Sequence, residues 1–99
     1  MFARLVSAQA GKGKLDEVTK TWKEDDIPLM HSVKGYRGAY LLTDRRTGKA
    51  ISMTLWDSEK DSDADRRSQL HRKQVNMYRD LLTGEIGYQG YEVSAEDKA

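Results

Sequence analysis

The chain has 99 residues, no cysteine, and 17 basic against 16 acidic side chains, which gives a net charge of +1. This length fits one small domain, and the balanced charge gives no broad electrostatic case for nucleic-acid binding, which needs an excess of basic side chains on one face. The absence of cysteine excludes disulfides, thiolate catalysis and cysteine-rich metal sites.

The chain begins with a predicted strand and an amphipathic helix. Residues 2–10 alternate as a strand does, and one face carries four residues: Phe2, Arg4, Val6 and Ala8. A helix is expected at residues 14–25, because apolar side chains repeat there at spacings of three and four: Leu15, Val18 and Trp22. Pro28 then interrupts the helical pattern. At this spacing we interpret Trp22 as a core residue.

Two further strands joined by a polar turn form a hairpin. We expect strands at residues 36–43 and 50–56, with the turn at residues 44–48. The second of these strands is partly apolar on both faces: Ile51, Met53 and Leu55 share one face, and Ser52, Thr54 and Trp56 share the other. Such a strand is covered twice, so we expect a packing partner on each side of the sheet.

A second helix and a last strand complete the chain. The start of this helix is ambiguous, because Ser58 and Ser62 each begin a serine-x-x-acid capping pattern. An apolar stripe follows, and Gly84 lies where the helix is expected to end. We expect the last strand at residues 88–94.

The predicted order is strand, helix, strand, strand, helix, strand, which is that of a ferredoxin-like α+β fold. In this βαββαβ arrangement two helices cover one face of an antiparallel four-stranded sheet. We expect a single domain over residues 1–94 and a polar tail at residues 95–99. The other sheet face would remain a large apolar patch, so we predict a homodimer joined through the sheet faces.

Three segments carry a family resemblance: residues 35–39 (GYRGA), 41–44 (LLTD) and 48–56 (GKAISMTLW). Together they resemble the antibiotic biosynthesis monooxygenase-like domain of the dimeric α+β barrel superfamily. The resemblance implies a barrel formed by the sheets of two subunits. Members of the family include cofactor-free oxygenases of polycyclic aromatics, haem-degrading enzymes, and proteins without an assigned activity.

The resemblance also bears on single residues. Trp56 matches a tryptophan found near the end of the third strand in both the cofactor-free and the haem-degrading members. The haem-degrading members add a first-strand asparagine, which this chain lacks, and a second-helix histidine nearer to the tryptophan than His71 is. The cofactor-free members place an asparagine shortly before the tryptophan, where this chain has Ser52. No catalytic residue is therefore assigned.

Six residues are candidates for a ligand pocket: Trp56, Tyr40, Thr54, Ser52, His71 and Tyr36. Tyr36 and Tyr40 are an even number of residues apart, so we expect them to share a strand face and to pair with the face of Trp56. His71 would close the pocket as an acid or a base. The competing interpretations place Trp56 in the core, His71 on the solvated surface, and the two tyrosines in cross-strand packing without a ligand.

These residues predict a cofactor-independent, monooxygenase-like protein that binds a small aromatic or quinol compound. The substrate itself would activate oxygen, and the protein would supply a dry pocket, orientation and a proton acceptor. The alternative is a non-catalytic, dimeric ligand-binding or stress-related module with the same pocket, and haem binding is a third hypothesis. No cofactor is expected, and no metal, because neither histidine has a second ligand at metal-binding spacing.

Targeting signals are not visible in the sequence. No apolar run approaches the roughly 20 residues of a membrane span. The N-terminal residues lack the basic region and cleavage site of a signal peptide. We therefore expect a soluble cytoplasmic protein with neither a membrane nor a nucleic-acid partner.

Overall fold

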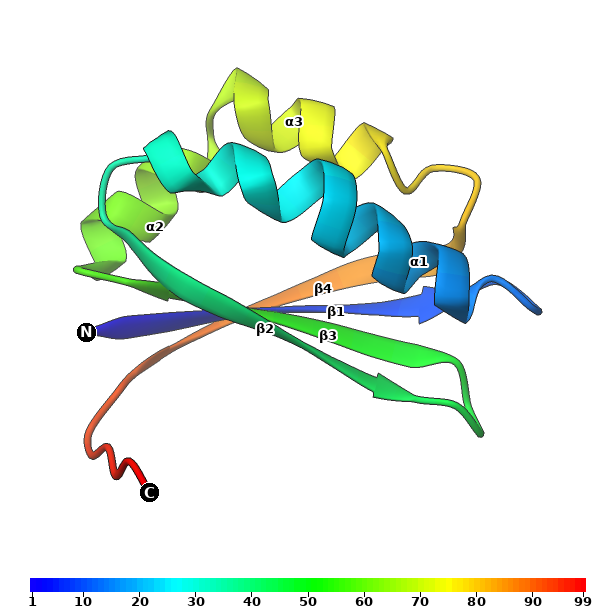
Figure 1. Ribbon diagram of the computed structural model, residues 1–99. Helices are drawn as coiled ribbons and strands as arrows, with labels where there is room; N and C mark the ends of the chain where they lie inside the picture. The colour runs from blue at the N-terminus through cyan, green and yellow to red at the C-terminus, as the bar shows by residue number, and fades with distance from the viewer.

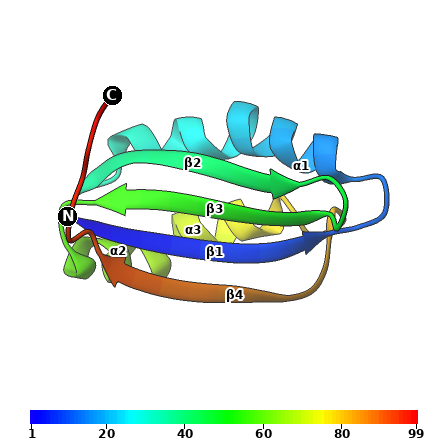
Figure 2. The same cartoon turned by 90° about the horizontal axis from the view of Figure 1, so that it is seen from below.

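Four antiparallel strands form one sheet in the order β2-β3-β1-β4, with all helices on one face (Figures 1 and 2). The computed structural model describes residues 1–99. In chain order the elements are β1 (Phe2–Ala10), α1 (Leu15–Thr21), the π-helical segment η1 (Trp22–Asp26), the 3₁₀ segment η2 (Ile27–Ser32), β2 (Tyr36–Asp44), β3 (Lys49–Trp56), α2 (Glu59–Arg66), α3 (Gln69–Asn76) and β4 (Leu82–Glu92). The predicted ferredoxin-like α+β fold is confirmed. None of the helices is long and apolar enough to cross a membrane.

The register between β1 and β3 decides which side chains lie beneath the helices. Phe2 pairs with Trp56, and Arg4 pairs with Thr54, on the helix-covered face. Leu5 pairs with Met53 on the opposite face, which we call the open face. This separation follows from the strict alternation of side chains along a strand.

The first helical region runs without interruption from Leu15 to Ser32 but changes its hydrogen-bond spacing on the way. Pro28 does not break it, because Pro28 lies at the start of η2, where a missing backbone N–H costs little. The face turned to the sheet repeats at spacings of four: Val18, Trp22, Asp26 and Met30.

The expected second helix is two helices. Ser58 Oγ accepts a hydrogen bond from the Asp61 backbone N–H at 3.2 Å and caps α2, which decides between the two predicted starts. Ser68 Oγ accepts from the His71 backbone N–H at 3.1 Å and caps α3. The Ser68 side chain accepts a hydrogen bond from a backbone N–H that a continuous helix would bond to a carbonyl oxygen. One helix therefore ends before Ser68 and another begins after it.

The last strand begins at Leu82, earlier than predicted, and Gly84 lies inside it rather than at a helix end. The pairing of β1 with β4 shifts register between Ser7 and Gln9, opposite the segment that contains Gly84. Gly84 has a φ of +71°, which glycine adopts without the steric cost of a Cβ atom. Gly84 therefore forms part of a β-bulge and does not end a helix.

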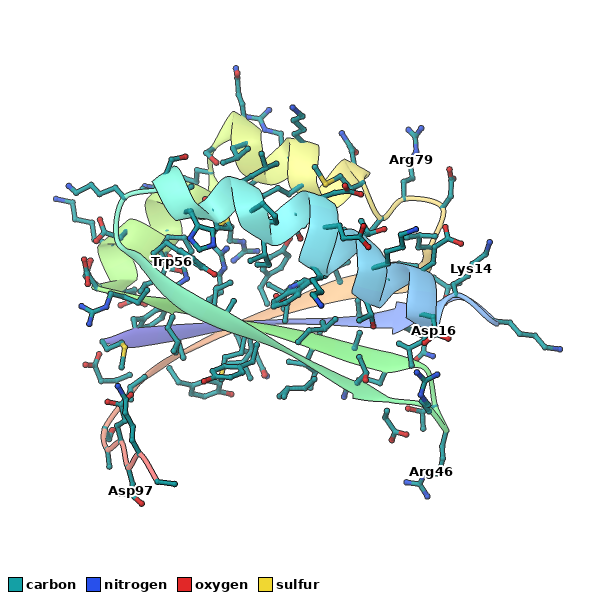
Figure 3. The ribbon with its side chains drawn as sticks, in the orientation of Figure 1. Lys14, Asp16, Arg46, Trp56, Arg79 and Asp97 are labelled. Atoms are coloured by element: carbon teal, nitrogen blue, oxygen red, sulfur yellow. The ribbon has the colours of Figure 1, made fainter.

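Two core clusters lie between the helices and the sheet, one at each end of β1. The first contains Phe2, Met30 and Trp56, and the second contains Ala10, Val18, Ala50 and Leu81. Trp56 is 0% exposed and lies in the layer between sheet and helices (Figure 3). Burying a large aromatic side chain contributes strongly to the hydrophobic free energy of folding.

The open face carries large apolar side chains without a covering layer in this chain. Tyr40, Leu42 and Tyr91 are 60%, 50% and 53% exposed. Seen from below, the four strands lie in front of the helices and no helix crosses them (Figure 2). Exposed apolar patches of this kind mark interaction surfaces.

Candidate functional site

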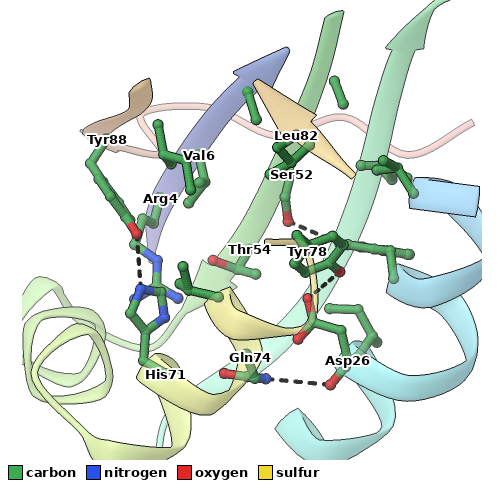
Figure 4. Close-up of a pocket in the computed structure, with 18 of the residues that line it drawn as sticks. Arg4, Val6, Asp26, Ser52, Thr54, His71, Gln74, Tyr78, Leu82 and Tyr88 are labelled. Carbon is green, nitrogen blue, oxygen red and sulfur yellow. Dashed lines mark hydrogen bonds between the residues drawn. The ribbon is translucent and has the colours of Figure 1, made fainter. Parts of the chain in front are cut away.

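A cavity of about 100 Å³ lies between the sheet and the helices, in the interval between the two core clusters. All four strands, the first helical region and α3 contribute to its wall, and the lining is mainly apolar (Figure 4). Apart from Ser52 and Thr54 on β3, the polar side chains of the wall fall into two groups. One group surrounds Arg4 on β1, and the other surrounds Asp26 on η1.

Arg4 is a buried cation with a buried counterion. Its Nη2 lies 2.9 Å from Asp65 Oδ2, and its Nη1 donates to the Ser62 carbonyl oxygen at 3.0 Å. The side chains of Arg4 and Asp65 are 8% and 1% exposed. The guanidinium carbon also lies 4.9 Å from the ring centroid of Trp56, within cation–π range. The pair joins β1 to α2, and removal of either partner would leave an uncompensated buried charge.

His71 on α3 lies beside this ion pair. Its Nε2 is 3.1 Å from the Tyr88 hydroxyl, and its Nδ1 is 3.9 Å from Asp65 Oδ2. Burial, and secondarily the Arg4 charge, lower the pKa of His71 below its ordinary value. The imidazole is therefore neutral at pH 7 and can donate or accept one hydrogen bond at each nitrogen.

Asp26 is the carboxylate of the opposite group. The Tyr78 hydroxyl donates to Asp26 Oδ2 at 2.5 Å, and Gln74 Nε2 donates to the Asp26 carbonyl oxygen at 3.3 Å. Burial raises the pKa of Asp26, an effect that the Tyr78 hydrogen bond partly opposes. Burial, reinforced by the Asp26 charge, also raises the pKa of the Tyr78 hydroxyl, so Tyr78 remains a donor. The raised pKa makes Asp26 a better proton acceptor than an exposed aspartate.

Three of the six pocket candidates line this cavity: Ser52, Thr54 and His71. Trp56 does not, because it is fully buried in the core cluster with Phe2 and Met30. Its indole Nε1 donates to Thr54 Oγ1 at 2.9 Å, and this hydrogen bond fixes the position of the Thr54 side chain in the cavity wall. The structure thus places Trp56 as the core interpretation describes.

The two tyrosines do not share a face, in contrast to the expectation from their spacing. Tyr36 pairs with Trp56, whereas Tyr40 pairs with Met53 on the open face. The pairing shifts register between Tyr36 and Gly38, and one extra residue there reverses the alternation. Gly38 permits this with a φ of +145°. Tyr36 packs edge-on against Trp56 with ring centroids 6.0 Å apart, and neither tyrosine lines the cavity.

Sequence reasoning missed several polar residues of the wall: Arg4, Asp26, Gln74, Tyr78 and Tyr88. A signal for Asp26 was present, because it follows Trp22 and precedes Met30 at spacings of four. Trp22 itself, predicted to be a core residue, lines the cavity and donates from Nε1 to Ser52 Oγ at 3.0 Å.

The donor set of the cavity is unsuited to holding a metal ion. No group of three or more histidine, cysteine, aspartate or glutamate side chains lies close enough together. What the wall offers is a proton acceptor at Asp26, hydroxyls at Ser52 and Thr54, and a cationic donor at Arg4.

Solved structures share this architecture at low sequence identity. A protein of unknown function from Nitrosomonas europaea matches with a TM-score of 0.78 and 15% identity, over 99% of this chain and 93% of that chain. Another N. europaea protein, described as a "putative antibiotic biosynthesis monooxygenase", matches with a TM-score of 0.77 and 11% identity, over 96% of this chain and 100% of that chain. A protein of the same description from Deinococcus radiodurans matches with a TM-score of 0.77 and 11% identity, over 100% of this chain and 98% of that chain.

No family model and no curated protein matches the sequence. At these identities the structural likeness establishes the fold alone. The chain therefore has the fold of proteins described as antibiotic biosynthesis monooxygenases, as the resemblance of its residues 35–56 implied.

Proposed function

We propose that the protein binds a single-ring phenol or quinol in the cavity and oxidises it with dioxygen, without a cofactor. The observation that carries this proposal is Asp26, a half-buried carboxylate on the wall of a mainly apolar cavity. A phenolic hydroxyl can donate to such a carboxylate while the ring lies against the apolar wall. The description of similarly folded proteins as monooxygenases supports the same class of reaction.

The size of the cavity limits the ligand. An apolar cavity of roughly 150 Å³ holds one benzene molecule, and the volume here is about 100 Å³. A single ring is therefore the largest ligand that the cavity favours, and side chains of the wall must move apart to admit a substituted ring. The polycyclic substrates that the family resemblance suggests would need a wider space.

The proposed reaction balances with a quinol as the electron donor. Asp26 accepts a phenolic proton, which leaves an electron-rich phenolate that can reduce dioxygen. One oxygen atom bonds to a ring carbon and displaces its hydrogen, and the other oxygen leaves as water. Hydroquinone and dioxygen thus give hydroxyquinone and water, with all four electrons supplied by the substrate. Asp26 returns its proton to the departing oxygen.

Oxygen uptake with hydroquinone tests this proposal. We expect the parent protein to consume oxygen in the presence of a metal chelator, and Asp26→Asn to lower the rate by roughly 10²–10⁴-fold, as loss of a general base does. Asp25→Asn is the matched control, because Asp25 is the exposed neighbour on the same segment. Equal rates in the two variants, at equal thermal stability, would contradict the role of Asp26.

A second candidate function is ligand binding without chemistry, and the position of Trp56 favours it. The resemblance assigns a pocket role to this tryptophan, yet its side chain is fully buried away from the cavity wall. Binding of hydroquinone by the parent protein, with no oxygen uptake above the rate without protein, would select this second function.

We also propose that two copies associate through their open faces. Support comes from the exposed apolar side chains there, Tyr40, Leu42 and Tyr91, and from the barrel that the resemblance implies. A twofold pairing would cover the same patch on both copies. Light scattering should then give twice the 11.3 kDa mass of one chain.

A further inference from the structure

The guanidinium of Arg4 has a donor that the protein does not use. Nη1 donates to the Ser62 carbonyl oxygen and Nη2 to Asp65, but Nε–H has no partner. Among the buried side-chain nitrogen and oxygen atoms of the chain, Arg4 Nε alone lacks one. The Arg4 side chain is 8% exposed and lines the cavity, but Nε itself is enclosed, so a ligand oxygen reaches it only when the side chains around it shift. An unpaired buried donor costs free energy, so an oxygen that accepts from it gains more than it would at the surface.

The charges around the cavity decide which oxygen fits. Asp65 already neutralises Arg4 at 2.9 Å, and His71, which faces the same group from α3, is neutral at pH 7. Asp26 faces the cavity from η1 with no cation bonded to it. An anionic substituent on the ligand would therefore meet Arg4, whose charge Asp65 already neutralises, and the carboxylate of Asp26. Like charges in a site of low dielectric constant repel strongly. A neutral oxygen avoids this repulsion and can still accept from Nε–H.

We propose that Arg4 Nε binds a second, neutral oxygen on the ligand, so that the cavity selects quinols and related dioxygenated rings over rings with one oxygen and over aromatic acids. The first oxygen is the hydroxyl that donates to Asp26, which lies on the other side of the cavity from Arg4 (Figure 4). Arg4 is then a specificity residue that touches the ligand. This inference rests on the proposed function, because it concerns the ligand of the same cavity.

The test compares probes that differ in one substituent, under argon so that no oxidation occurs. Hydroquinone and 4-methylphenol have nearly the same shape, but 4-methylphenol carries a methyl group in place of the second oxygen. 4-Hydroxybenzoate carries an anion there. NMR titration of the ¹⁵N-labelled protein gives each affinity, and the Arg4 Nε–H signal reports directly on the donor.

We expect hydroquinone to bind about tenfold more tightly than 4-methylphenol, as one hydrogen bond to a charged donor provides. Hydroquinone should move the Arg4 Nε–H signal, and 4-hydroxybenzoate should bind more weakly than hydroquinone. Arg4→Lys keeps a cation for Asp65 but lacks Nε–H, so it should abolish the preference. Arg66→Lys is the matched control, because Arg66 stacks on Tyr88 outside the cavity wall, and it should retain the preference.

The failures of the two proposals are distinguishable. Equal affinity for hydroquinone and 4-methylphenol, or an unmoved Arg4 Nε–H signal at saturation, overturns the role of Arg4 and leaves the phenol-binding cavity intact. Tighter binding of 4-hydroxybenzoate than of hydroquinone overturns the preference for a neutral oxygen. Absence of binding by all three probes overturns the proposed function and this inference together. Should Arg4→Lys not fold, the Nε–H signal of the parent protein still decides.

Discussion

Neighbouring residues of β3 end in opposite environments. Thr54 and Trp56 lie beneath the helices and are 4% and 0% exposed. Met53 lies on the open face beside Tyr40, which is 60% exposed. Met53, Thr54 and Trp56 share a strand and similar neighbours in sequence, so strand parity rather than composition decides which side chains form the core.

The two faces also differ in where they place charged and apolar side chains, and the arrangement is the reverse of the usual one. The covered face buries the Arg4–Asp65 ion pair, whereas the open face exposes apolar side chains such as Tyr40 and Leu42. Buried charges need specific partners, and exposed apolar groups need a cover. The proposed ligand chemistry therefore belongs to the covered face, and the proposed contact between copies belongs to the open face.

Removal of the core tryptophan should have the largest effect on folding. Trp56→Ala deletes a fully buried aromatic side chain and should lower the free energy of unfolding by roughly 3–5 kcal/mol. Tyr91→Ala on the open face is the control, because Tyr91 is 53% exposed. Urea unfolding at two protein concentrations separates the cases, since an effect through association depends on concentration and a core effect does not. A concentration-dependent loss in Trp56→Ala would contradict its core role.

The buried ion pair should matter far more than an exposed pair of equal length. Arg4–Asp65 and Arg37–Asp57 both have N–O distances of 2.9 Å, but the second pair is more than half exposed. Asp65→Asn leaves Arg4 buried without a counterion and should cost about 3–5 kcal/mol. Asp57→Asn should cost at most about 1 kcal/mol. Similar losses in both variants, measured by urea unfolding, would refute the dependence of the ion pair's contribution on burial.

A charge on the open face should act on association and leave the fold intact. Met53→Lys places an ammonium group among apolar side chains where the proposed partner copy packs, so light scattering should give the mass of one chain. Its far-ultraviolet circular dichroism should match that of the parent. Thr43→Lys is the control, because Thr43 is an exposed residue of β2 on the other face. A dimer that survives Met53→Lys would rule out the open face as the interface.

Much of the fold could be predicted from alternation and capping alone. The faces of β1 and β3 follow from period-two patterns, and the start of α2 at Ser58 is one of the two starts that the capping pattern offered. The features that could not be predicted each depend on the backbone conformation at one or two residues. The bulge before Gly38 reverses strand parity, and Ser68 divides a segment that was predicted to be one helix. Neither feature changes composition or periodicity enough to be visible in the sequence.

The candidate site was predicted in part, for a related reason. Ser52, Thr54 and His71 line the cavity, because their faces follow from simple periodicity. Arg4 and Asp26 were missed because charged residues are assigned to solvent by default. Their burial depends on partners far away in the sequence, Asp65 and Tyr78. Such partners become visible only when the sheet and helices are brought together.

The smallest expected effect is a pH dependence carried by His71. Burial and the Arg4 charge hold the pKa of His71 below its ordinary value of 6.5. As the pH falls through 6.5, histidine in the unfolded chain takes up a proton, while His71 in the folded protein stays neutral until a lower pH. The unfolded state then binds more protons, so stability falls as the pH decreases below about 6.5.

His71→Gln should remove this part of the pH slope, because glutamine keeps a hydrogen-bonding group toward Tyr88 without titrating. His31→Gln should retain the slope, since His31 is exposed. Urea midpoints measured between about pH 5 and pH 8 give the comparison. Parallel curves for the parent and His71→Gln would mean that His71 takes up a proton equally well in both states. A charged His71 would then be tolerated beneath the helices. The covered face would exclude charge and water less than its small exposed area indicates.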